Sequence, residues 1–316
     1  MSDRRQEQVS RAHEPIGPLT SDTMDETRAA VFTGARPLLF AIAYRMLGSV
    51  ADAEDLVQDA YLRWQQAHGE EIRAPHAYLT TIVTRLAINQ LQSARHQRES
   101  YVGPWLPEPL VTEDAPDPAE PIELAESLSM AFMLMLERLS PIERAVLLLH
   151  DVFDFEYGEI ARIVDKSEAN CRQLLSRAKK HLGKAEARFD ADPAQAERLL
   201  QRFNTAANAG DFDGMVAVLA EDITLWTDGG GKARGATLTP IHGAENVARF
   251  MAGVGPRYAA MERTIRAAQI NGQPGFLVYV GGRAHAAVIF EVRDARIQAI
   301  YSISNPDKLE TLPDLT

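Results

Sequence analysis

Hydrophobic residues recur at helical spacing in two stretches of the chain, residues 30–100 and 122–189. In the first stretch, Leu39 and Ile42 fall on one face of a helix with a period of about 3.6 residues. Ser49 then precedes a segment rich in acidic residues, an order that favours a helix start through capping and the helix dipole. The pattern therefore predicts two all-α regions.

Near residue 190 the pattern changes. One more helical segment is followed by β-branched segments in which apolar and polar residues alternate: "DITLWTD", "PGFLVYVGG", "AHAAVIFEVRD" and "RIQAIYSIS". A chain of 316 residues is also too long for one comfortable core. We therefore expect a multidomain protein in which two all-α helical domains precede an α+β domain.

Proline, glycine and polar residues mark where these regions end. The stretch "YVGPWLPEPLVTEDAPDPAEP" is too rich in proline for a helix or a central strand, so it reads as an extended linker. The expected division is a disordered arm at 1–25, helical domains at 26–100 and 122–189, the linker at 101–121, and the α+β domain at 194–316.

The composition of the chain indicates its cellular compartment. The single cysteine, Cys171, cannot form an internal disulfide and fits a reducing cytoplasm. We read it as a small buried apolar side chain rather than a redox switch. The N-terminus lacks the apolar core of a signal peptide, and no stretch approaches the roughly 20 apolar residues that span a bilayer. The sequence therefore predicts a cytoplasmic protein without a membrane partner.

The net charge of −11 argues at first against a polyanionic partner, but the charge is unevenly spread. Basic residues outnumber acidic ones between Lys166 and Arg188, and a second basic cluster lies between Arg95 and Arg98. Because phosphates respond to the local field, two cationic patches in an acidic protein remain compatible with nucleic-acid binding.

The segment "FEYGEIARIVDKSEANCRQLLSRAKKHL" reads as two helices joined by a short turn. The second helix buries one face and turns polar side chains outward, as a recognition helix in the major groove does. Any amphipathic helix pair with a charged face is the alternative. The buried positions are Cys171, Leu174, Leu175 and Ala178; the outward ones, after Ser167 at the turn, are Asn170, Arg172, Gln173, Ser176, Arg177 and Lys180.

Two longer blocks and three short motifs resemble a known family. "FAIAYRMLGSVADAEDLVQDAYLRW" resembles region 2 of sigma factors of the extracytoplasmic-function type, and "LSPIERAVLLLHDVFDFEYGEIARIVDKSEANCRQLLSRAKKHL" resembles their region 4. The motifs "WLPEP", "DGGGK" and "NPDKL" resemble those of the subgroup with a fused SnoaL-like domain, an α+β cone with a curved sheet. The resemblance covers nearly the whole chain, except its N-terminal arm.

The resemblance implies that the protein binds core RNA polymerase and opens promoter DNA. The partners would be the β′ clamp helices, the β flap, and the −10 and −35 elements. The positions are Asp52, Glu54, Asp55 and Gln58 for core polymerase, Arg85, Asn89, Arg95, His96 and Arg98 for the −10 element, and Ser167, Asn170, Arg172, Gln173, Ser176, Arg177 and Lys180 for the −35 element.

Some of these assignments leave alternatives. The acidic residues after Ser49 could only cap their helix. At the −10 position, Asn89-Gln90 stands where many members have an acidic second residue, so the selected base stays open. The linker would enter the polymerase channel with Glu108, Glu113 and Asp114 mimicking nucleic-acid charge, and a plain tether is the alternative.

The glycine run in "WTDGGGKARG" invites comparison with a phosphate-binding loop. It fails the required spacing, because Trp226 replaces the first glycine and Ala233 the hydroxyl residue. We expect regulatory contacts instead, with Asp307 and Lys308 exposed after the last strand. The candidate contact residues are Trp105, Leu106, Pro107, Glu108 and Pro109, then Asp228, Gly229, Gly230, Gly231 and Lys232, and finally Asn305, Pro306, Asp307, Lys308 and Leu309.

We therefore expect a monomeric sigma factor, without cofactor or metal, whose C-terminal domain tunes its activity in cis. One alternative is a helix-turn-helix regulator that binds duplex DNA without polymerase. The other is an enzyme with an appended DNA-binding half, because SnoaL-like relatives use a carboxylate or histidine as base. Its candidate bases are Asp222, Asp228, His242, His285, Glu291 and Asp294, none of them in a catalytic motif.

Overall fold

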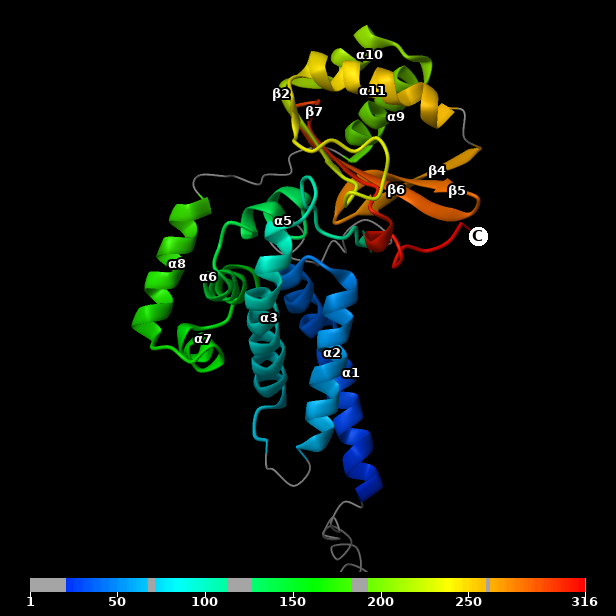
Figure 1. Ribbon diagram of the computed structural model, residues 1–316. Helices are drawn as coiled ribbons and strands as arrows, with labels where there is room; N and C mark the ends of the chain where they lie inside the picture. Colours follow the sequence, from blue (N-terminus) through cyan, green and yellow to red (C-terminus); the bar gives the residue numbers. More distant parts are fainter. Residues whose placement is uncertain (1–20, 68–71, 113–126, 183–192, 260–261, 316) are drawn as a thin grey trace, which may run out of the picture.

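The structure is a computed structural model that describes residues 21–67, 72–112, 127–182, 193–259 and 262–315 (Figure 1). Helices make up the N-terminal half, and a sheet with three helices makes up the C-terminal half (Figure 1). The linker runs between the two halves, and its position determines how they touch.

Three helices form the first helical domain: α1 (Ser21–Leu47), α2 (Val50–Gln66) and α3 (Pro75–Glu99). The expected cap of α2 is present, because the Ser49 hydroxyl accepts a hydrogen bond from the Asp52 N–H at 3.1 Å. Asp52 sits in the first turn of α2, where the helix dipole favours an acidic side chain.

The second helical domain packs directly on the first. Apolar side chains of both domains belong to one continuous core, so the two domains form a single body in this conformation. Its elements are α5 (Met130–Leu136), α6 (Pro141–Leu147), a π-helical turn (Leu148–Val152), α7 (Tyr157–Val164) and α8 (Glu168–Leu182).

The C-terminal domain is a curved sheet with helices on one face (Figure 1). The strand order is β1-β4-β5-β6-β7-β2-β3, antiparallel except for the parallel pair β2 and β7. The helices are α9 (Pro193–Ala209), α10 (Phe212–Val216) and α11 (Ala244–Ala259); the strands are β2 (Leu219–Asp228), β3 (Ile241–His242), β4 (Arg263–Ile270), β5 (Gln273–Val280), β6 (Arg283–Arg293) and β7 (Arg296–Ile303).

The linker itself supplies the outer strand of this sheet. Strand β1 (Val111–Thr112) pairs with β4, with Val111 opposite Ile270. An edge position suits a proline-rich segment, which has few N–H groups to donate to a ladder. The segment expected to be an extended tether is therefore part of the C-terminal domain's sheet.

The two faces of the sheet pack against different partners. On β6, Val288 and Phe290 pack in one core with residues of α9, α10 and α11, and we call this the helix-covered face. Ala287 and Ile289 alternate with them and share a core with Leu106 of the linker, α5 and the C-terminal tail. We call this second side the linker-covered face.

Helix α1 differs from two expectations. It begins at Ser21, inside the segment expected to be a disordered arm. Within it, the stretch Arg28–Leu47 is long and apolar enough by composition to cross a bilayer, so the expectation that no stretch approaches this limit is wrong. Leu39, Ile42 and Tyr44 from this stretch are fully buried, which explains the composition because core helices meet the same criterion.

Candidate functional site

The DGGGK loop leaves the end of β2 as a tight turn. Gly230 and Gly231 have φ angles of 57° and 71°, a region that favours glycine. A Cβ on Gly230 would collide with the Asn305 amide, and one on Gly231 would stand 3.1 Å from the Cβ of Val102. The glycines therefore let this loop approach both the C-terminal tail and the linker.

Asp228, the last residue of β2, is the centre of these contacts. One oxygen of its buried carboxylate accepts hydrogen bonds from the Leu106 N–H at 2.8 Å and the Lys308 ammonium at 2.7 Å. The other accepts from the Tyr101 hydroxyl at 2.5 Å and the Gly230 N–H at 3.1 Å. The linker, the loop and the tail thus converge on one carboxylate.

Lys308 is 7% exposed, so the expectation that it faces solvent is wrong. A short 3₁₀ turn, η2 (Pro306–Lys308), follows the last strand and carries the side chain back over the linker. Its ammonium pairs with Asp228, donates to the Leu106 carbonyl and lies 4.3 Å from the centroid of the Trp105 ring. The sequence concealed this, because the partner acid lies far away along the chain.

A second ion pair joins the two motifs at the surface. The Lys232 ammonium lies 2.5 Å from the Asp307 carboxylate, and the two side chains are 55% and 57% exposed. Exposed pairs of this kind contribute little to stability, typically below about 1 kcal/mol. Two ion pairs therefore join the DGGGK and NPDKL motifs. The pair Asp228–Lys308 is buried, whereas the pair Lys232–Asp307 is exposed.

On its other side the linker contacts the first helical domain. The Glu108 carboxylate accepts hydrogen bonds from the Ser49 hydroxyl at 2.8 Å and from the N–H groups of Val50 at 2.6 Å and Ala51 at 3.2 Å. These are free N–H groups at the start of α2, where an anion is favoured. Glu108 is therefore buried as a helix cap here, and does not face solvent as a mimic of nucleic acid.

Trp105 covers the turn between α1 and α2. Its ring would lie 2.6 Å from a Cβ on Gly48, a residue with φ of 69°. Leu106–Pro109 are buried, whereas Glu113 and Asp114 lie outside the described residues. The segment Trp105–Pro109 contacts Asp228 and Lys308 on one side and Gly48–Ala51 on the other. We call this set of contacts the linker junction.

Two side chains missed by sequence reasoning strengthen this junction. The Tyr44 hydroxyl donates to the Glu108 carbonyl at 2.7 Å and accepts from the Asn271 amide at 2.6 Å. Asn271 also donates to the Leu128 carbonyl at 3.1 Å and accepts from the Leu110 N–H at 3.0 Å. In the sequence, Asn271 reads only as part of an Asn-Gly turn between strands.

Two tyrosines of the junction are held in their neutral form. Burial raises the pKa of Tyr44 well above its usual value. Burial also raises the pKa of Tyr101, and its hydrogen bond to the negatively charged Asp228 raises it further. Both hydroxyls therefore act as hydrogen-bond donors throughout the physiological range.

The expected recognition helix has the predicted division of faces. In α8, Cys171, Leu174, Leu175 and Ala178 are buried, and burial raises the pKa of the Cys171 thiol. The Ser167 hydroxyl accepts from the Asn170 N–H at 3.2 Å at the helix start. The outward residues Asn170, Arg172, Gln173, Ser176, Arg177 and Lys180 are all exposed. The polar face of α8 is therefore exposed along the described helix.

The residues expected to bind the −10 element lie on α3, which faces the helix-turn-helix. Arg85 donates from its guanidinium to the carbonyls of Ile163 at 2.8 Å and Arg162 at 2.9 Å, at the end of α7. Asn89 is exposed. The side chains of the remaining three candidates, Arg95, His96 and Arg98, lie outside the described residues. Arg85 is therefore engaged within the protein in this conformation.

The acidic surface of α2 is open to a partner. Asp55 and Gln58 are exposed, and Asp52 is half-buried. Glu54 lies 2.5 Å from Arg36 of α1, in a pair that is about half exposed on both sides. Because Ser49 and Glu108 satisfy the N–H groups at the helix start, the acidic side chains need not serve as caps.

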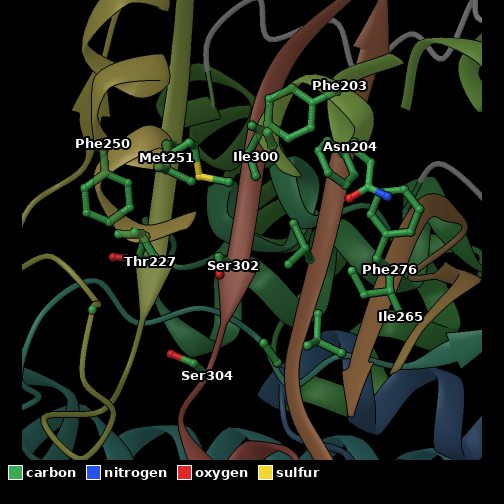
Figure 2. Close-up of a pocket in the computed structure, with 18 of the residues that line it drawn as sticks. Phe203, Asn204, Thr227, Phe250, Met251, Ile265, Phe276, Ile300, Ser302 and Ser304 are labelled. Carbon is green, nitrogen blue, oxygen red and sulfur yellow. The ribbon is translucent and has the colours of Figure 1, made fainter. Parts of the chain in front are cut away.

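The candidate bases of the C-terminal domain do not line the cavity on its helix-covered face, and of the six only His285 lines another described pocket, beside the C-terminal tail. A cavity of about 150 Å³ lies on the helix-covered face (Figure 2). Among the described residues that line it, none is Asp222, Asp228, His242, His285, Glu291 or Asp294. Within the described part of the chain, no three His, Cys, Asp or Glu side chains gather to hold a metal ion. The described residues that line this cavity therefore include no carboxylate or histidine.

Comparisons with known proteins match each part of the chain. The Sigma-70 region 2 family model matches residues 31–97, the Sigma-70 region 4 model residues 129–182, and the SnoaL-like domain model residues 200–300.

Two relatives that match most of the chain are from Mycobacterium tuberculosis. The chain is 40% identical to the ECF RNA polymerase sigma factor SigJ over 294 residues, which cover 89% of this chain and 93% of SigJ. It is 28% identical to the probable ECF sigma factor SigI over 287 residues, 90% of this chain and 95% of SigI. The crystal structure of SigJ matches with a TM-score of 0.70 and 38% identity, over 93% of this chain and 100% of that one.

Proposed function

Because the chain belongs to the extracytoplasmic-function family of RNA polymerase sigma factors, we propose that its SnoaL-like domain regulates initiation in cis by holding the linker junction closed. The protein directs promoter-specific transcription initiation as a sigma factor. The observation that carries the regulatory role is the buried Asp228 carboxylate, which accepts from the linker backbone and from the tail.

The surfaces of the helical half fit the partners of a sigma factor. The acidic side chains of α2 (Asp52, Glu54, Asp55) and Gln58 bind core polymerase, where opposite charge raises the rate and selectivity of encounter. The exposed face of α8 reads the −35 element through bidentate contacts to base edges. The basic end of α3 engages the −10 element. The protein works in the cytoplasm as a monomer and needs no cofactor.

The closed conformation cannot serve both promoter elements at once. Their centres lie about 25 base pairs apart, which is on the order of 85 Å along B-form DNA. In the closed protein, α3 contacts α7 of the helix-turn-helix through Arg85, and the two helical domains share one core. The domains must therefore separate on polymerase, and the linker that ties both to the sheet must leave the junction.

Polymerase competes with the junction for the linker. The closed form reduces the fraction of protein competent to bind, which weakens the apparent affinity for polymerase by that fraction. Replacing Asp228 by Asn leaves Lys308 buried without its counter-charge, and so favours the open form. Asp307→Asn removes a carboxylate from the exposed pair of the same two motifs, and provides a matched control.

The test is promoter-directed transcription in vitro with increasing core polymerase. With limiting polymerase, we expect Asp228→Asn to raise transcript yield about tenfold, which corresponds to about 1.4 kcal/mol, and to match the wild type at saturation. Asp307→Asn should stay within about twofold of the wild type. Equal yields from Asp228→Asn and the wild type at every polymerase concentration would refute the proposal.

A further inference from the structure

The helix-covered face of the C-terminal sheet contains a cavity of about 150 Å³ (Figure 2). Its walls are mostly apolar, and Figure 2 shows Phe250 and Met251 of α11 on one side of the cavity, with Phe203 of α9 and Phe276 of β5 on the other. A dry cavity of this volume with apolar walls holds a single benzene-sized ring.

One end of the cavity is polar. Thr227, Ser302 and Ser304 place hydroxyl groups there, at the ends of β2 and β7 (Figure 2). Thr227 bonds the hydroxyl of Thr237 at 2.9 Å, and Ser304 bonds the Asp228 carbonyl at 3.4 Å. Ser302 makes no side-chain hydrogen bond to another residue in the described part of the chain. Its hydroxyl is therefore available to a molecule inside.

The cavity disfavours a charged occupant. Among the described residues that line it, Arg263 alone is ionisable, and its guanidinium donates to Asn208 at 2.7 Å. Asn208 is exposed, so this pair lies at the rim. A charge placed deeper, between the phenylalanine rings, would lose its hydration without a partner.

We propose that this cavity is a binding site for a compact, uncharged ring compound that carries one hydroxyl or carbonyl group. The ring packs between Phe203, Phe250 and Phe276, and its polar group bonds the Ser302 hydroxyl. An apolar pocket with a few convergent polar groups is the usual form of a small-molecule site.

Occupancy of this site bears on the linker junction through two shared strands. Successive side chains of a strand point to opposite faces. On β7, Ser302 lines the cavity, while Tyr301 and Ile303 pack on the linker-covered face. On β2, Thr227 lines the cavity and the next residue is Asp228. A bound ring stabilises the closed junction to the extent that it binds this arrangement of β2 and β7 more tightly than the arrangement left when the linker departs. This coupling rests on the function proposed above, whereas binding itself does not.

Binding is tested with phenol and toluene, which have nearly the same shape. Phenol carries a hydroxyl group where toluene carries a methyl group. In an NMR titration of the full chain, we expect saturable binding of both. Ala207→Phe on α9 fills the cavity and should weaken both affinities at least about tenfold, whereas Ala209→Phe, at an exposed position of the same helix, should leave them within about twofold. Absent saturation, or equal affinities in the two variants, would overturn the site.

Ser302→Ala tests the polar end without adding volume. It should weaken phenol about fivefold and leave toluene unchanged, because only phenol loses a hydrogen bond. Equal changes for both compounds would contradict the proposed orientation.

The coupling has its own measurement. Saturating phenol should slow amide hydrogen exchange at Leu106 in the wild type, by up to the factor 1 + [phenol]/Kd that applies when only the closed form binds. Binding with unchanged exchange at Leu106 would remove the coupling and keep the site. If Asp228→Asn left amide hydrogen exchange at Leu106 unchanged, that result would instead refute the role of Asp228 in holding the linker junction closed.

Discussion

The two faces of the C-terminal sheet use the same strands for different purposes. On β7, Tyr301 and Ile303 lie on the linker-covered face in a core with Leu106, whereas Ile300 and Ser302 line the cavity of the helix-covered face. One face is covered by the linker, α5 and the C-terminal tail, and the other retains a cavity of about 150 Å³. The C-terminal domain therefore contacts the helical half through its linker-covered face, and not through the cavity of its helix-covered face.

The largest expected effect on this comparison comes from Lys308→Met, which leaves the Asp228 carboxylate buried without its counter-charge. Breaking one partner of a buried pair costs about 3–5 kcal/mol. We expect hydrogen exchange of the Leu106 amide to speed up about 100-fold or more, because each 1.4 kcal/mol is a factor of ten. Lys232→Met, which breaks the exposed pair, should change it less than about fivefold. Similar exchange in both variants would show that burial of the pair does not matter.

A smaller effect is expected from Gly48→Ala, on the side of the linker that faces the helical half. The new Cβ would lie 2.6 Å from the Trp105 ring, and the alanine would have to keep a φ of 69°, which residues with a Cβ rarely adopt. Strain and displacement together should cost about 1–3 kcal/mol. The measurement is hydrogen exchange of the Glu108 amide, which donates to the Gly48 carbonyl at 2.8 Å.

Gly210→Ala is the matched control for that experiment. Its φ is 67° but nothing lies within 4 Å of the added Cβ, so it carries the strain without the collision. Faster exchange at Glu108 in both variants, or in neither, would contradict the role of Trp105 as a cover for the α1–α2 turn.

The smallest effect concerns pH. The pKa values of Tyr44 and Tyr101 are raised in the folded protein above the usual 10.0, mainly by burial. Their contribution is therefore fully present below pH 10 and is lost as pH rises above it, because the unfolded form ionises first. Between pH 10 and 11 the buried Tyr44 should lower stability by about 1 kcal/mol, and Tyr101, which is only half-buried and therefore screened by solvent, by less. The free energy of unfolding in urea should fall more steeply between pH 10 and 11 for the wild type than for Tyr101→Phe. The same pH dependence in both proteins would contradict this prediction.

The sequence predicted most of what is local. The caps, the helical faces of α8 and the change to an α+β domain follow from residues close together in the chain, such as Ser49 with Asp52. Three short motifs marked the junction, but their pairing depends on contacts between distant segments. Lys308 reads as exposed because a tail after a strand usually is. Tyr44 and Asn271 carry no local signal, since a core tyrosine and a hairpin Asn-Gly turn look ordinary in sequence.

A reversible covalent link tests the central claim, that the linker must leave the C-terminal domain before initiation. The Cβ of Val102 lies 3.1 Å from the position of a Cβ on Gly231, slightly closer than the range of about 3.5–4.5 Å that disulfides adopt, so a small outward shift of the loop brings the pair into range. Val102→Cys with Gly231→Cys would therefore fasten the linker to the DGGGK loop. Cys171 is buried and should not compete.

The measurement is promoter-directed transcription by the oxidised double variant before and after dithiothreitol, with oxidised Val102→Cys alone as control. If the linker must leave, transcript from the oxidised double variant should fall at least about tenfold and recover on reduction, and the control should show no loss. Full activity of the oxidised, cross-linked protein would contradict the account, because initiation would then proceed with the linker still held against the C-terminal domain.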